Sequence, residues 1–149
     1  MANIVEQIHD QIKSQTQTEL GATWTEMPRV FDPTNNDLRS IKRSFGVLHG
    51  AAFSVEGITK VYTLDQTFTV LLATSFSERI DDDATQDEIN TLYNQADELL
   101  KKFIASKLAL PSVVHYVSNP SIDAPEILEN SAVLLRVNFD VRYRSLIDS

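Results

Sequence analysis

The chain has 149 residues, of which 42% are hydrophobic and 23% charged, a composition typical of one soluble globular domain over residues 1–149. It has no cysteine, which excludes disulfides, thiolate metal sites and a cysteine nucleophile. The net charge of -8 argues against non-specific nucleic-acid binding, and no apolar run is long enough to span a membrane. The N-terminus resembles no signal peptide, so we expect a cytoplasmic protein.

The first predicted element is a helix over residues 3–20. Its apolar side chains recur at helical spacing and form a narrow stripe: Ile4, Val5, Ile8 and Ile12. The polar run that follows Lys13 predicts fraying before Gly21, a residue type that commonly ends helices. So narrow a stripe fits a helix that lies on one face of a sheet.

Five later segments have the pattern of strands: residues 24–31, 45–55, 61–76, 113–117 and 133–146. Pro28 restricts the first segment to a sheet edge or a strand end. Apolar residues on both faces of residues 68–73 indicate a central, covered strand. Residues 118–130 contain two prolines and are predicted to form a connection.

Residues 45–55 alternate between two faces at the period of a strand. One face is expected to carry Phe45, Val47, His49, Ala51, Phe53 and Val55. On the other face, Gly46 and Gly50 leave room for a close approach or mark bulges.

Residues 133–146 show the second clear alternation. One face is expected to carry Leu135, Val137, Phe139, Val141 and Tyr143, and the other Arg136, Asn138, Asp140, Arg142 and Arg144. This pattern indicates one helix-covered face and one polar face. A strand much longer than the usual ~5–6 residues can leave a compact domain or line an interface.

The clearest element is an amphipathic helix over residues 85–110, begun by a Thr85–Glu88 capping box and ended by Pro111. Its apolar face is predicted to hold Ile89, Leu92, Tyr93, Ala96, Leu99, Leu100, Phe103 and Ile104. The order helix, strands, helix, strands predicts an α+β fold. We expect a mostly antiparallel sheet with the N-terminal helix and the long central helix packed on one face.

The acidic residues after the third segment invite interpretation as a metal site. A calcium loop from Asp81 would need glycine at its sixth position and glutamate at its twelfth, where this chain has Gln86 and Leu92. The three histidines, His9, His49 and His115, are far apart in sequence, and no catalytic motif occurs. We therefore predict no catalytic, cofactor-binding or metal-binding residues, no cofactor and no enzymatic activity.

Charge alone supplies candidate residues for a subunit or partner interface. They are a basic patch beside a turn, an acidic loop and the arginines of the last strand: Arg39, Lys42, Arg43, Asp81, Asp82, Asp83, Arg136, Arg142 and Arg144. Arginine is enriched in interfaces and pairs well with carboxylates. Complementary charges on one chain are suited to a head-to-tail ring, although ordinary solvated surface charge gives the same pattern.

The order of elements resembles the tail terminator proteins of long-tailed bacteriophages, also called tail completion or minor tail proteins. The resemblance rests on the N-terminal helix and on four phrases: FGVLHGAAFSV, VYTLDQTFTVLLATSF, TQDEINTLYNQADELLKKFIASKL and AVLLRVNFDVRYRSL. It covers most of the chain as a distributed pattern with no signature motif.

The resemblance implies a sheet flanked by helices in a subunit of a hexameric ring. Such a ring caps the tail tube, ends tube polymerisation and offers a surface for joining the head. It implies a virion protein at the head-proximal end of the tail, assembled in the host cytoplasm. The implied partners are further copies of the chain, the tail tube protein and the head–tail connector, with no membrane and no sequence-specific nucleic acid. Another connector or neck protein, a small soluble enzyme and a monomeric binding module stay open as alternatives.

Overall fold

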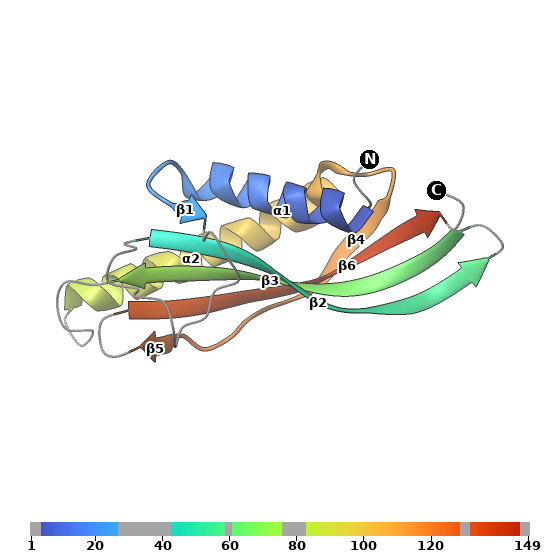
Figure 1. Cartoon of the computed structure of the whole chain (residues 1–149). Coiled ribbons are helices and arrows are strands. Elements are labelled where there is room, and N and C mark those ends of the chain that lie inside the picture. The colour runs from blue at the N-terminus through green and yellow to red at the C-terminus, as the bar shows by residue number, and fades with distance from the viewer. Residues whose placement is uncertain (1–3, 27–42, 59–60, 76–82, 129–131, 147–149) are drawn as a thin grey trace.

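The computed structural model describes residues 4–26, 43–58, 61–75, 83–128 and 132–146 (Figure 1). In chain order the elements are α1 (Ile4–Leu20), β1 (Thr25–Glu26), β2 (Arg43–Ile58), β3 (Val61–Ser75), α2 (Asp83–Ser106), the 3-10 helix η2 (Lys107–Ala109), β4 (Val114–Ile122), β5 (Glu126–Leu128) and β6 (Ala132–Leu146). Among these described residues, two α-helices accompany a six-stranded sheet, in which β1 and β2 are the one pair that runs parallel. The predicted α+β class with a mostly antiparallel sheet is therefore confirmed.

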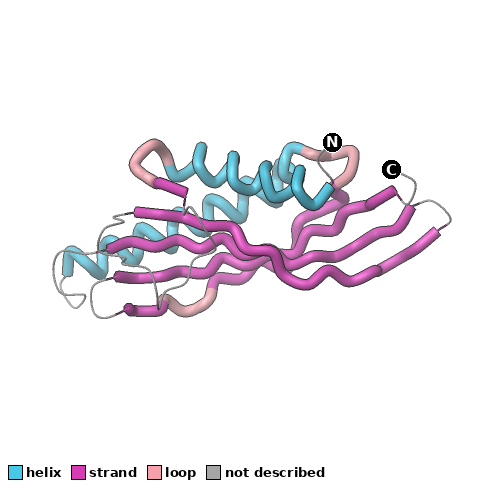
Figure 2. The backbone as a smooth tube through the Cα atoms, in the orientation of Figure 1, coloured by secondary structure: helices cyan, strands magenta, loops and turns pink. Residues whose placement is uncertain are grey.

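Two long central strands, β3 and β6, organise the sheet. The strand order is β1-β2-β3-β6-β4, and β5 also pairs with β6. β3 and β6 are antiparallel in unbroken register from Val61 opposite Leu146 to Ser75 opposite Ala132. The long strands twist along their length, and the far ends of β2 and β3 project past the ends of both helices (Figure 2).

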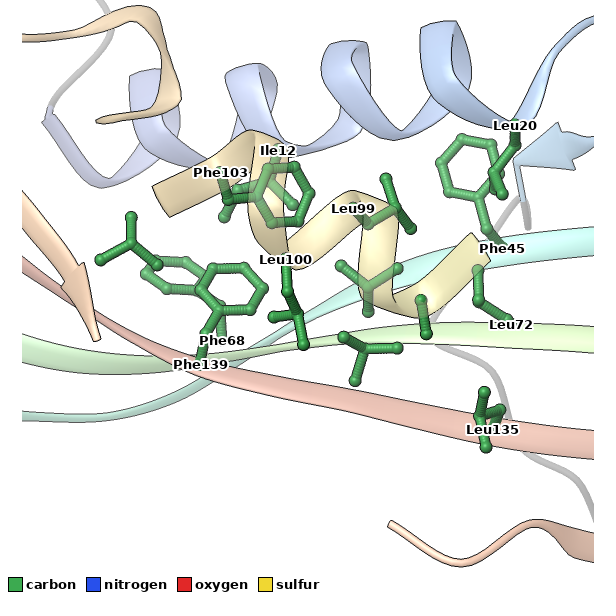
Figure 3. Close-up of a cluster of buried hydrophobic side chains, with 14 of the residues drawn as sticks. Ile12, Leu20, Phe45, Phe68, Leu72, Leu99, Leu100, Phe103, Leu135 and Phe139 are labelled. Carbon is green, nitrogen blue, oxygen red and sulfur yellow. The ribbon is translucent and has the colours of Figure 1, made fainter. Parts of the chain in front are cut away.

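Both helices contribute side chains to one hydrophobic core on one face of the sheet. The core includes Ile8 and Ile12 of α1, Leu92, Leu99 and Phe103 of α2, Phe68, Val70 and Leu72 of β3, and Val137, Phe139 and Val141 of β6. Figure 3 shows these elements meeting around the rings of Phe68, Phe103 and Phe139. The β3 and β6 residues of this core have one parity along each strand, as the period of 2 requires.

A smaller apolar cluster lies on the opposite face of the sheet, at the end where β3 finishes. It consists of Leu71, Ala73, Ala132 and Leu134, with Leu48 packed against them. Residues 70–73 of β3 are therefore apolar on both faces, which confirms the prediction of a covered strand there, whereas Thr67 and Thr69 make the preceding part of this face polar.

Helix α1 does not fray after Lys13, contrary to the prediction from its polar run. It continues to Leu20, whose side chain is buried in the core, and Gln15 and Thr16 are buried on the way. Gly21 ends the helix with φ of 93°, as predicted, and the Gln17 side-chain amide donates hydrogen bonds to the carbonyls of Gly21 and Trp24. This turn carries the chain into β1, which confirms an edge strand here; residues 27–42 lie outside the described part.

The predicted bounds of the long helix are wrong at both ends. Helix α2 begins at Asp83, so the predicted capping position at residue 85 lies inside it. The helix ends at Ser106, because the following three residues adopt positive φ. This turn places Leu108 in the core with no exposed surface, so burial of one side chain outweighs continuation of the helix.

A bulge in β2 reverses the faces of the sheet to which the side chains of Ala52 and Phe53 point. The pairing with β3 shifts between His49 and Ala52, so His49 pairs with Phe68 but Phe53 pairs with Asp65. The prediction that Phe53 shares a face with Phe45 is therefore wrong, because an extra residue reverses the alternation. Gly50 marks the bulge, as one of its two predicted roles allowed. A Cβ there would lie 2.8 Å from the Thr67 carbonyl oxygen.

The two prolines predicted that residues 118–130 form a connection, but part of this segment forms strands. β4 runs through Pro120 to Ile122, and β5 adds a second short strand beside β6. Pro120 is tolerated because β4 is an edge strand whose pairing is interrupted between Ser118 and Ser121.

Replacing Phe103 by alanine should lower the free energy of unfolding by about 3–5 kcal/mol. Phe103 is fully buried, and its ring centroid lies 5.1 Å from that of Phe139. Ile104, the next residue, is 42% exposed, so Ile104→Ala is the matched control and should cost less than about 1 kcal/mol. Urea unfolding monitored by circular dichroism checks both, and equal losses would contradict the packing described for α2.

Candidate interaction surface

The face of the sheet opposite the helices is polar over most of the length of β6. Arg136, Asn138, Asp140 and Arg142 alternate there with the buried residues that face the helices, which confirms the predicted alternation. We call this surface the open face. On β3 it carries Asp65, Thr67 and Thr69, which stand directly opposite Arg142, Asp140 and Asn138.

The strongest contact on the open face joins Arg142 to Asp65. The guanidinium donates two hydrogen bonds of 2.7 Å to the two carboxylate oxygens, a bidentate geometry. Arg142 also lies over the ring of Tyr116, with its Cζ 5.0 Å from the ring centroid. The hydrogen bonds from Arg142 lower the pKa of Asp65 below its usual 3.8, and those to Asp65 raise the pKa of Arg142. Arg142 is thus held on two sides by neighbouring strands.

Two further rows of hydrogen bonds cross the open face. Thr67 donates to one oxygen of Asp140 at 2.7 Å, and the Asn119 amide donates to the other at 2.9 Å. In the next row, the hydroxyl of Thr69 donates to the side-chain oxygen of Asn138 at 2.8 Å. Asn138 in turn donates to Asp123. Donors and acceptors on three strands therefore satisfy one another, which fixes the side chains of this surface.

The other two arginines of β6 also have partners within the chain. Arg136 lies 2.6 Å from Glu126 of β5, in a pair that is more than a third exposed. Arg144 donates to the backbone carbonyl of Ser112 at 3.1 and 2.7 Å and contacts no carboxylate in those bonds. Arg144 is thus exposed, and the partner in its described hydrogen bonds is a neutral carbonyl group rather than a carboxylate.

The structure does not gather the charged candidates into one surface. Arg43 lies on the helix-facing side of β2, where it forms a 2.8 Å ion pair with Glu88 of α2. The β6 arginines lie on the opposite side of the sheet. Arg39, Lys42, Asp81 and Asp82 are outside the described residues, as is the side chain of Asp83, whose backbone begins α2.

A row of four residues across the open face was missed from the sequence. Phe53, Asp65, Arg142 and Tyr116 stand opposite one another on β2, β3, β6 and β4. The alternation of residues 61–76 could have shown that Asp65 faces away from the core. The bulge that brings Phe53 to this face, and the extension of β4, have no comparable signal in the sequence.

Two of the histidines lie in contact, which their wide separation in the sequence did not indicate. The rings of His9 on α1 and His49 on β2 have centroids 4.5 Å apart, and His49 also packs edge-on to Phe68. Partial burial, and then the charge of His9, lower the pKa of His49 below 6.5. Over the described part of the chain, no group of three or more His, Asp or Glu residues is placed to hold a metal ion.

Comparison with protein-family models and with curated protein sequences finds no match to this chain. None of the described helices is long and apolar enough to cross a membrane. The arrangement of the open face is that of a flat, internally hydrogen-bonded surface with exposed aromatic residues at its margins, a composition suited to contact with another protein.

The Asp65–Arg142 pair should make stability depend on pH in the acid range. The folded pKa of Asp65 lies below its unfolded value of 3.8, so its contribution is present above pH 3.8 and is lost as the pH falls through the folded pKa. Asp65→Asn should cost about 1 kcal/mol at pH 7, because the pair is partly exposed.

Urea titrations at pH 7, 5 and 3 check this expectation. The stability difference between the parent and Asp65→Asn should narrow at the lowest pH. Glu98→Gln is a control, since Glu98 pairs only at 3.6 Å with the exposed Lys101. A difference that stays constant with pH would contradict the proposed role of the Asp65 carboxylate.

Proposed function

We propose that this protein is a structural virion protein whose copies form a ring on the end of a phage tail tube. In this role the ring ends polymerisation of the tube and provides the surface to which the head is joined. The subunit acts by binding, without a cofactor or an enzymatic step. Its partners are further copies of itself, the tail tube protein and the head–tail connector, and its place is the head-proximal end of the tail.

The observation that supports this proposal most is that the two faces of the sheet differ in the side chains they carry. β2, β3 and β6 have 16, 15 and 15 residues, against ~5–6 in a usual strand. One face carries the core shared with both helices, whereas much of the other carries a fixed network of polar side chains. A long, rigid and partly uncovered sheet is an arrangement suited to repeated subunit contacts.

The resemblance noted in the sequence supports the same proposal independently of this surface. It predicted a sheet flanked by helices from the order of the elements alone. The hypothesis also explains why strands would extend beyond their helices (Figure 1). Strand ends that project past the helices are placed to reach a neighbouring subunit.

Solution mass and tube growth together test the proposal. Light scattering over a concentration series, with negative-stain imaging of the same samples, should show rings of about six subunits. Added to polymerising tail tube protein, the chain should bind tube ends and shorten the tubes. Tubes that grow to the same length, with no chain bound at their ends, would contradict the terminator function even if rings form.

Charge reversal of an arginine on β6 tests whether these residues contribute to the contact between subunits. Arg142→Glu would place a carboxylate against Asp65 and destabilise the subunit itself, so any loss of assembly would be ambiguous. Arg144→Glu is the better variant, because Arg144 is exposed and its described hydrogen bonds go to a backbone carbonyl.

We expect Arg144→Glu to change the free energy of unfolding by less than about 1 kcal/mol while weakening ring formation. Lys107→Glu is the matched control, since Lys107 is an exposed cation of η2 and takes part in none of the described salt bridges. Urea unfolding and light scattering at two salt concentrations check the pair. Normal assembly of Arg144→Glu would remove Arg144 from the interface.

A further inference from the structure

The row of four residues across the open face ends in an exposed aromatic side chain at each edge of the sheet. Phe53 on β2 is 67% exposed, and Tyr116 on β4 is 39% exposed. Between them lies the bidentate Asp65–Arg142 pair, so the row reads Phe53, Asp65, Arg142, Tyr116. Large aromatic residues and arginine are the types that dominate binding at protein interfaces.

The Phe53 end of the row is a projecting apolar feature. Phe53 follows Gly50, Ala51 and Ala52, which are small and exposed. No Lys, Arg, Asp or Glu occurs from Ser44 to Val55, so this edge lacks the charges that usually keep edge strands from associating. Among the described strands, only β1 pairs with the outer side of β2, and it reaches no further than Phe45.

The Tyr116 end of the row is a flat platform. The guanidinium of Arg142 lies over the Tyr116 ring, and Asp65 holds that guanidinium with two hydrogen bonds. Because Arg142 is already fixed, a ligand that packs against the platform loses little side-chain entropy on binding. The Arg142 charge is neutralised by Asp65, so the platform suits an aromatic or apolar side chain better than a charged one.

We propose that Phe53 of one copy of the chain packs onto the Tyr116–Arg142 platform of the next copy. Every copy carries both halves of this contact at the same level of the sheet but on opposite edges. Such a contact is heterologous, so each copy can bind one neighbour through Phe53 and another through Tyr116, and repetition closes into a ring or continues as a filament. The inference rests on the proposed ring function and names the contact within it.

Two single variants test the two halves of the contact. Phe53→Ala and Tyr116→Ala should each weaken self-association by about tenfold or more in sedimentation and light scattering. Phe53→Tyr and Tyr116→Phe keep the rings and should associate as the parent does. Ile104→Ala removes an exposed apolar side chain from α2 and should leave self-association unchanged. Urea unfolding of each variant separates loss of association from loss of folding.

Mixing the two variants tests the head-to-tail geometry directly. Phe53→Ala retains the platform, and Tyr116→Ala retains the phenylalanine, so one intact contact can form between them. The mixture should give heterodimers, whereas each variant alone stays monomeric and the parent forms larger species. Two isologous contacts, Phe53 on Phe53 or Tyr116 on Tyr116, would give no such rescue.

Association of both alanine variants equal to that of the parent would overturn the inference while leaving the ring function intact. A parent chain that stays monomeric up to about 1 mM, where even a weak contact of ~4 kcal/mol would appear, would also overturn it. Tube-end binding is measured separately, so failure of this contact and failure of the terminator function give different results.

Discussion

Continuous pairing of β3 with β6 is the constraint on which the rest of the structure depends. Their register is unbroken over the full length of both strands, so side chains of one parity face the helices and those of the other face away. A slip of β6 by one residue against β3 would turn Phe139 out of the core and bring Arg142 into it, on the opposite face from Asp65. Burying an unpaired arginine in place of an aromatic ring is strongly unfavourable, which fixes the register.

The open face is then a consequence of the core. Once Phe139 and Val141 are buried against α2, Asn138, Asp140 and Arg142 must point to the other side. They meet partners there because β3 follows the same alternation, with Thr69, Thr67 and Asp65 at the matching positions. Each hydrogen bond adds only about 1 kcal/mol, but together they hold the side chains in one arrangement.

The spacing of apolar residues along the sequence correctly predicted the elements that bury one regular face. The amphipathic face of α2, the alternation of β6 and the stop at Gly21 all follow from local patterns. Local patterns did not predict the helix ends and the strand extension that depend on packing between distant segments. Leu108 leaves the helix because the core can bury it, and α1 continues through its polar run to Leu20, which the core also buries. β4 continues through Pro120 because its outer edge needs no donor.

The charged interface candidates show that a local pattern also fails to predict which side chains form ion pairs. Composition placed arginines on β6 correctly, but it could not show that Asp65 and Glu126 would meet Arg142 and Arg136. An arginine that is already paired is a poor candidate for a charge-driven interface, because a partner must compete with its existing carboxylate. The uncharged side chains beside these ion pairs, Phe53 and Tyr116, are therefore better candidates for an interface than the paired charges.

The bulge at Gly50 has the largest consequence for function of any local feature. Without it, Phe53 would share the helix-facing side with His49, as a strict alternation requires. One extra residue turns Phe53 to the open face, into line with Asp65, Arg142 and Tyr116. Glycine is the residue that permits this, since a side chain at position 50 would collide with the Thr67 carbonyl. A backbone irregularity at one glycine therefore decides which surface the exposed aromatic ring can offer to a partner.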